Sequence, residues 1–174
     1  MALGVISLLI VGNGEVADEN YGKNGSCTLA VSGIKVRYFF DSEALYNGLH
    51  KDVIQEVANS AGGSEHCDAI VVTDSKIYIY ELSANKGRSV EEYLKKFEWC
   101  LAFLKYFNEK VSDIGLDRNE IHLVIVTTPD AYDKLNDEMK YTNNAQKRFK
   151  MGVFSRYINR LQRYVKLCKT VNKT

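Results

Sequence analysis

The sequence contains only one proline, Pro129, and no segment rich in serine, proline or glycine divides its 174 residues. We therefore expect no flexible linker, and the length fits a single domain over residues 1–174. Hydrophobic residues make up 45% of the chain, which is enough to form a core and excludes a largely disordered protein.

No hydrophobic run reaches the length that spans a bilayer. The apolar segment at the N-terminus is short and lacks the basic start of a signal peptide. We interpret residues 5–11 within it as a buried strand. The sequence therefore predicts a soluble protein of the cytoplasm that does not associate with a membrane.

None of the four cysteines belongs to a CxxC pair, so a zinc site is not expected. We interpret them as buried free thiols, with disulfides as the alternative if the protein comes from a hyperthermophile. A phosphate-binding loop is also missing, because the glycines of residues 12–25 do not lead into Gly-Lys-Ser/Thr before a helix. This segment is expected to be an ordinary loop.

Acidic side chains are absent from the end of the chain. None follows Glu138, whereas residues 140–174 contain ten lysines and arginines. Because the whole chain holds 23 basic and 22 acidic residues, residues 1–139 carry a net charge of −9 and residues 140–174 a net charge of +10. A concentrated positive charge attracts polyanions, so nucleic acid is the first partner to consider. A basic segment that pairs with the acidic body is the alternative.

Apolar residues at steps of three and four predict a long amphipathic helix over residues 143–168. Three arginines then lie together beside the apolar stripe, and the guanidinium group suits phosphate binding. A dimer interface or a contact with acidic lipid is an alternative for this helix, but the stripe is needed for the core. The candidate nucleic-acid-binding residues are Lys147, Arg148, Arg156, Arg160 and Arg163.

Hydrophobic patterns elsewhere predict, in order, a strand, a hairpin, a helix, a second hairpin, a helix and a strand before the terminal helix. This order indicates an α/β protein in which helices cover a mixed sheet. The first hairpin turns at residues 32–33 and completes a group of N-terminal strands within residues 5–40. The expected strands are 26–31, 34–40, 67–72, 76–83 and 121–127, and the expected helices are 42–60 and 90–109.

The second hairpin, residues 67–83, holds the strongest chemical signal. A tight turn at residues 74–75 places Asp68 opposite Glu81 on the same face of the sheet. Like charges in this position destabilise a sheet unless something offsets their repulsion. Paired carboxylates are ligands that Mg²⁺ or Mn²⁺ prefers. A slipped register, or a basic neighbour that pairs with one carboxylate, is the alternative.

This arrangement resembles the PD-(D/E)xK nuclease superfamily, which has the restriction-endonuclease-like fold, and most closely its small archaeal Holliday-junction resolvases. In that family a helix precedes a strand that opens with a metal-binding Asp. A short hairpin then leads to a strand ending in Glu-x-Lys, and a helix and an apolar strand follow. Residues 42–128 resemble this core. The resemblance implies that Asp68 and Glu81 bind Mg²⁺ or Mn²⁺, with Glu56 as a candidate third ligand.

Serine stands at position 83, where the family has its lysine. A serine cannot supply the positive charge that stabilises the attacked phosphate. Lys86 is therefore the candidate replacement in the catalytic set with Asp68 and Glu81, and Lys95 and Lys96 on the following helix are alternatives.

The expected function is thus that of a divalent-metal-dependent endonuclease that hydrolyses phosphodiester bonds in DNA. Branched or structured DNA is a candidate substrate, and a homodimer is a candidate assembly because many family members dimerise. Two other functions stay open. One is a catalytically inactive nuclease-fold protein that binds nucleic acid or serves in assembly, which Ser83 favours. The other is a protein-interaction module unrelated to nucleic acid.

Overall fold

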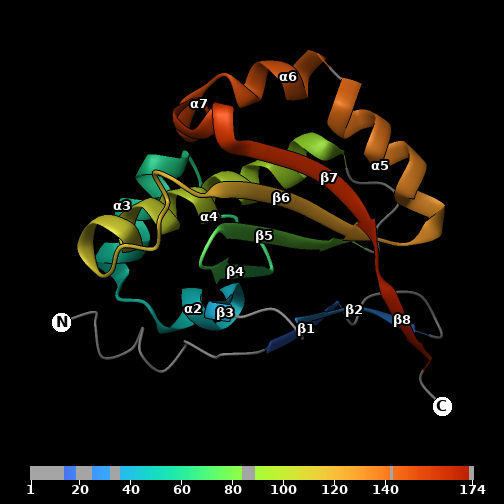
Figure 1. The fold of residues 1–174 in the computed structure, drawn as a ribbon, viewed down its shortest axis with the longest axis horizontal. Helices are drawn as coiled ribbons and strands as arrows, with labels where there is room; N and C mark the ends of the chain where they lie inside the picture. The colour runs from blue at the N-terminus through green and yellow to red at the C-terminus, as the bar shows by residue number, and fades with distance from the viewer. Residues whose placement is uncertain (1–13, 19–24, 32–35, 84–88, 142, 173–174) are drawn as a thin grey trace.

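The computed structural model describes residues 14–18, 25–31, 36–83, 89–141 and 143–172. Within these residues the chain forms an α/β fold with a five-stranded mixed sheet, a three-stranded sheet and flanking helices (Figure 1). The strand expected over residues 5–11 lies outside the described part of the chain.

The described strands and helices follow one another in an order that interleaves the two types. The strands are β1 (Gly14–Asp18), β2 (Gly25–Val31), β3 (Val36–Asp41), β4 (Ala69–Thr73), β5 (Lys76–Ser83), β6 (Glu120–Thr127), β7 (Leu161–Leu167) and β8 (Lys169–Asn172). The helices are α2 (Ser42–Gly48), α3 (Lys51–Ala61), α4 (Val90–Lys110), α5 (Pro129–Tyr141), α6 (Asn143–Phe149), α7 (Gly152–Tyr157) and the 3₁₀ helix Ile158–Arg160.

The larger sheet has the strand order β3-β4-β5-β6-β7. Its first three strands pair in antiparallel fashion, whereas β5, β6 and β7 run parallel. Parallel neighbours need long crossover connections, and here α4 joins β5 to β6 while α5 to α7 join β6 to β7. The three parallel strands therefore end at the same edge of the sheet.

The two faces of this sheet are covered by different layers. Helices pack on one face, where Ile70 and Ile79 point into the main core. The opposite face carries Val71 and Tyr80 and contacts the small sheet β1-β2-β8. Burial on both faces explains why the interior strands β4 and β6 are almost wholly apolar.

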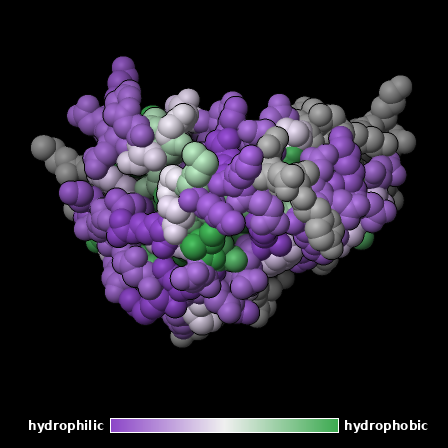
Figure 2. All heavy atoms as spheres, turned by 90° about the horizontal axis from the view of Figure 1, so that it is seen from above, coloured by the Kyte–Doolittle hydropathy of each residue, from purple (hydrophilic) through white to green (hydrophobic). Residues whose placement is uncertain are grey.

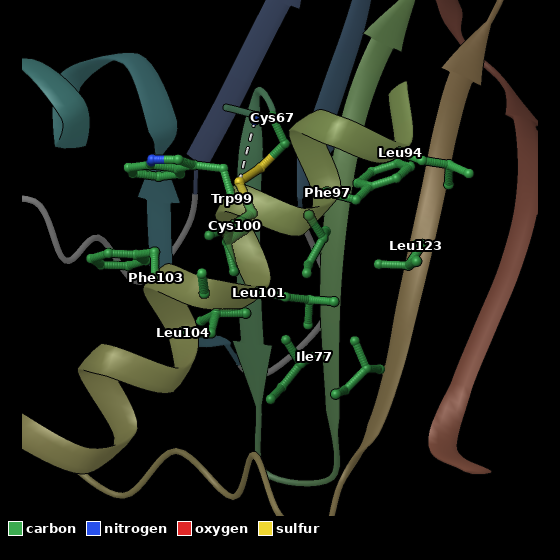
Figure 3. Close-up of a cluster of buried hydrophobic side chains, with 14 of the residues drawn as sticks. Cys67, Ile77, Leu94, Phe97, Trp99, Cys100, Leu101, Phe103, Leu104 and Leu123 are labelled. Carbon is green, nitrogen blue, oxygen red and sulfur yellow. Dashed lines mark hydrogen bonds between the residues drawn. A yellow bond between two sulfur atoms is a disulfide. The ribbon is translucent and has the colours of Figure 1, made fainter. Parts of the chain in front are cut away.

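Helix α4 is the central packing element of the helical layer. The backbone amide of Ser89 donates a hydrogen bond to the Glu92 carboxylate at 3.1 Å, which marks its start. Eleven of its side chains are buried, and Figure 3 shows several of them stacked against the sheet. Burying a large apolar side chain contributes about 1.5–3 kcal/mol, so this helix is a major source of stability.

The structure confirms the second hairpin, the helix over 90–109 and the apolar strand over 121–127, with small changes of boundary. The helix expected over 42–60 is two helices, because the chain is extended at Leu49 and His50. His50 caps α3, and its Nδ1 accepts a hydrogen bond from the amide of Asp52 at 3.3 Å.

The prediction of a first hairpin is wrong, because β2 and β3 belong to different sheets. Strand β2 pairs with β1, which lies inside the segment expected to be a loop, and with β8 near the other end of the chain. Local sequence patterns cannot indicate that β2 pairs with a strand so distant in the sequence. The predicted turn at residues 32–33 lies outside the described residues.

The prediction of a long basic helix over residues 143–168 is also wrong. The chain breaks between α6 and α7 at Lys150 and Met151, and Gly152, the first residue of α7, has a φ of 55°. Residues Leu161–Leu167 then form β7, which completes the sheet beside β6. Pairing with an open sheet edge satisfies the backbone groups of this segment, and this tertiary effect outweighs the helical periodicity of its side chains.

Two of the cysteines are not free thiols. Cys67 and Cys100 form a disulfide, and both are fully buried. Cys168 is a free thiol, as expected, but it is only half-buried. No helix in the described part of the chain is both long and apolar enough to cross a membrane.

Candidate functional site

Several polar residues gather at one edge of the large sheet, the right-hand end in Figure 1. Strands β5 and β6 end there in register, with Ser83 beside Thr127. Because β4 runs antiparallel to β5, its start lies at the same edge, directly after Asp68. Ligand sites of α/β proteins commonly lie at the carboxyl ends of parallel strands, so this edge is a candidate ligand site.

The pairing of β4 with β5 follows the predicted register, with Ala69 opposite Tyr80 and Ile70 opposite Ile79. The amide of Asp68 donates a hydrogen bond to the Tyr80 carbonyl at 3.0 Å. The Asp68 Oδ2 atom accepts one from the amide of Leu82 at 2.6 Å. Leu82 directly follows Glu81, so the Asp68 carboxylate lies beside the backbone of the second carboxylate-bearing residue.

Glu81 is buried, with 1% of its side chain exposed, and forms an ion pair with Lys96 of α4. A carboxylate removed from water is costly unless a cation and hydrogen bonds compensate for its lost hydration. The alternative of a basic neighbour that pairs with one carboxylate therefore applies to Glu81. Lys96 is one of the helix lysines considered as a substitute for the family lysine.

A second polar contact joins α4 to the same strand. The hydroxyl groups of Ser83 and Tyr93 share a hydrogen bond, and both residues are buried. The Ser83 carbonyl accepts a hydrogen bond from Thr127 Oγ1 at 2.8 Å, which ties the ends of β5 and β6 together. Glu81 and Ser83, two residues apart on β5, thus contact Lys96 and Tyr93, which are three residues apart on α4. Once the Ser83–Tyr93 contact is known, this match of spacings selects Lys96 over Lys95, but the sequence alone does not reveal that contact.

The other candidates for this site do not join the cluster. Glu56 is exposed on α3. Lys86 lies outside the described residues. Lys95 is exposed and lines a surface groove with Glu98 and Arg148 instead.

Within the described residues no group of three or more His, Cys, Asp or Glu side chains could hold a metal ion. Mg²⁺, however, is usually held by only one or two carboxylates, and water and substrate phosphates complete its six ligands. Asp68 and Glu81 provide a donor set of this kind, with the hard oxygen chemistry that Mg²⁺ and Mn²⁺ prefer. By their donor chemistry, these two residues fit a divalent cation.

The candidate nucleic-acid-binding residues are distributed over α6, α7, the 3₁₀ helix and β7, so the expected row of three arginines does not exist. Lys147 and Arg156 are exposed. Lys150 is exposed as well and adds to the positive charge beside them. Figure 2, viewed from above Figure 1, shows a mainly hydrophilic surface.

The remaining three arginines make contacts inside the protein. Arg148 binds Glu98 through two hydrogen bonds of 2.7 and 3.0 Å, which raise the pKa of its guanidinium. Arg160 donates to the carbonyls of Leu116 and Asn119 at 2.6 and 2.7 Å. Arg163 lies over the ring of Phe149, and burial lowers its pKa. These arginines stabilise the fold, and the basic stretch is less available to a polyanion than its charge suggests.

Comparison with protein-family models, with curated proteins and with solved structures gave no match for this chain.

Proposed function

We propose that this protein is a divalent-metal-dependent DNA endonuclease with Asp68, Glu81 and Lys96 in its active site. The observation that carries the proposal is the ion pair between buried Glu81 and Lys96 at the carboxyl end of β5, beside the Asp68 carboxylate that binds the Leu82 amide. The order of elements supports it, because α3, β4, β5, α4 and β6 follow the sequence of helices and strands that the nuclease resemblance implies.

Each of the three side chains has a distinct part in this proposal. Asp68 is half-buried and held by the Leu82 amide, so one of its oxygens is oriented by the backbone while the group keeps access to solvent. Glu81 would hold the cation from the buried side. When bound, Mg²⁺ or Mn²⁺ polarises the scissile phosphate and favours ionisation of a water molecule.

Lys96 supplies the positive charge that Ser83 lacks. Its side chain is 21% exposed, so the ammonium group neutralises Glu81 while part of it faces solvent. A cation fixed beside a phosphate stabilises the extra negative charge of the transition state. Exposed Lys147, Lys150 and Arg156 would add non-specific attraction for the DNA backbone, and branched or structured DNA remains the candidate substrate.

Cleavage of supercoiled plasmid and of a four-way junction in the presence of Mn²⁺ tests this function. The wild-type protein should nick both substrates, and Asp68→Asn should abolish the reaction. Glu109→Gln, which changes an exposed acid at the far end of α4, should cleave normally. Absence of cleavage with any divalent cation, by folded protein, would contradict the proposal.

A second candidate is a nuclease-fold protein that binds DNA without cutting it. The ion pair between Lys96 and Glu81 favours this candidate, because the lysine already offsets the repulsion that a metal ion would otherwise relieve. Such a protein should shift DNA in a gel, with affinity that falls steeply with salt, and Mn²⁺ should not raise its melting temperature.

A further inference from the structure

Both cysteines of the buried disulfide are close in sequence to residues of the proposed active site. Cys67 directly precedes Asp68, and Cys100 lies one helical turn after Lys96 on α4. Figure 3 shows the bond joining the start of β4 to the middle of α4. The same covalent link therefore connects the segments that carry one carboxylate and the lysine.

Hydrogen bonds extend this connection to a third segment. The amide of Cys67 donates to Cys100 Sγ at 3.3 Å. The Ser42 hydroxyl lies 3.4 Å from Cys67 Sγ, and the Ser42 amide donates to the Asp68 carbonyl at 3.0 Å. Asp68 is thus restrained by the disulfide before it, by Ser42 at its carbonyl and by Leu82 at its carboxylate.

We propose that the Cys67–Cys100 disulfide positions Asp68 relative to Lys96 and makes the site sensitive to redox state; its effect on metal binding rests on the function proposed above. A dithiol such as dithiothreitol reduces the bond by transferring two electrons and two protons to the sulfur atoms. The products are two cysteine thiols and the cyclic disulfide of the reagent. In the reduced protein, the start of β4 and α4 are held together only by packing and hydrogen bonds.

The order of the site is expected to change more than the order of the core. Helix α4 packs into the core on both sides of Cys100, with Phe97 before it and Phe103 and Phe107 after it, and this apolar packing does not need the bond. Asp68 belongs to a short loop before β4 and is itself only half-buried, so it has less packing to hold it. Reduction should therefore move Asp68 while leaving the fold in place.

Mn²⁺ affinity, measured by calorimetry, is the first test. The protein is compared in its oxidised form, after refolding with dithiothreitol, and after reoxidation with oxidised glutathione, with thiols counted by mass spectrometry. We expect Mn²⁺ to bind the reduced form more weakly by about 10- to 100-fold, the usual effect of losing support around a metal ligand. Reoxidation should restore the affinity.

Two variants separate positioning from general stability. Cys67→Ala combined with Cys100→Ala should reproduce the reduced form. Leu104→Ala removes a fully buried side chain one turn further along α4, and this variant should lose stability but keep its Mn²⁺ affinity while folded. Equal loss of affinity in Leu104→Ala would overturn the positioning role, and so would a reduced protein that does not fold.

Hydrogen exchange of the Leu82 amide reports on Asp68 without any metal. This amide donates to the Asp68 carboxylate and should exchange faster, relative to the core amide of Leu123, in the reduced form. Unchanged relative protection would refute the inference. If exchange responds to reduction but oxidised protein binds no Mn²⁺, the disulfide positions Asp68 and the metal-dependent function fails.

Discussion

Two clusters, each with two carboxylates and one cation, lie on different sides of helix α4. The inner cluster, facing β5, contains Asp68, Glu81 and Lys96. The outer cluster, facing α6, contains Glu91, Glu98 and Arg148. Both pair a cation with an acid, yet their geometry differs in ways that separate a candidate site from a structural contact.

The outer cluster is built on a planar guanidinium that binds Glu98 with two parallel hydrogen bonds, a rigid geometry suited to holding α6 against α4. The inner cluster uses a lysine, whose ammonium group is a compact charge on a flexible stem. It also lies at the ends of the parallel strands β5 and β6, and the disulfide joins the segments that carry Asp68 and Lys96. The comparison suggests that chemistry belongs to the inner cluster and stability to the outer one.

The largest expected effect on stability comes from the disulfide, which only the inner cluster has. Its two cysteines are 33 residues apart, and removing such a cross-link costs about 4 kcal/mol through the added freedom of the unfolded chain. Urea unfolding of the Cys67→Ala, Cys100→Ala double variant measures this loss, with Cys168→Ala as the control for a free thiol. A loss below about 1 kcal/mol would show that the cross-link contributes little to the stability of the fold.

Lys96→Met should have the next largest effect, on catalysis. Removing one preorganised charge from a transition state slows a reaction by about 10²- to 10³-fold, and single-turnover DNA cleavage would measure the change. Lys95→Met tests the neighbouring lysine, which faces the outer groove, and we expect a much smaller effect. A larger loss in Lys95→Met would reverse the assignment of the two sides of α4.

The inner cluster was partly predictable from the sequence. The register of β4 and β5 followed from alternating side chains and a turn that Thr73 stabilises, since its Oγ1 accepts a hydrogen bond from the Lys76 amide at 3.0 Å. The choice between two adjacent lysines depended on how α4 rotates over the sheet. That rotation is set by packing of side chains distant in sequence, which no local pattern records.

The outer cluster and the disulfide could not be predicted from local sequence patterns, because both join residues that are distant in the sequence. Arg148 was expected to face a nucleic acid, but its partner Glu98 is 50 residues away on another helix. The pairing of Cys67 with Cys100 depends on the position of α4 over β4. In the same way, Val165 fits a helical stripe, yet it packs in a strand because the edge of β6 was open to pairing.

A pair of glutamine variants compares the two clusters directly. Glu98→Gln should lower the free energy of unfolding by about 2 kcal/mol, because hydrogen bonds to a charged partner contribute roughly this amount. It should keep the rise in melting temperature that Mn²⁺ produces. Glu81→Gln should lose that rise. Loss of the Mn²⁺ response in Glu98→Gln would place the metal site in the outer groove.

The smallest expected effects concern the basic surface. The sequence predicted that Arg156 and Arg160 bind nucleic acid together, but the structure gives them different environments. Arg156 is exposed, so Arg156→Ala should weaken DNA binding slightly and reduce the slope of log affinity against log salt by about 1. Arg160 donates to the carbonyls of Leu116 and Asn119, so Arg160→Ala should lower stability and leave the salt slope unchanged. Fluorescence anisotropy across a salt series, with parallel melting curves, measures both quantities. If Arg160→Ala changed the slope and Arg156→Ala did not, the DNA would have to approach over the loop between α4 and β6, and not over α7.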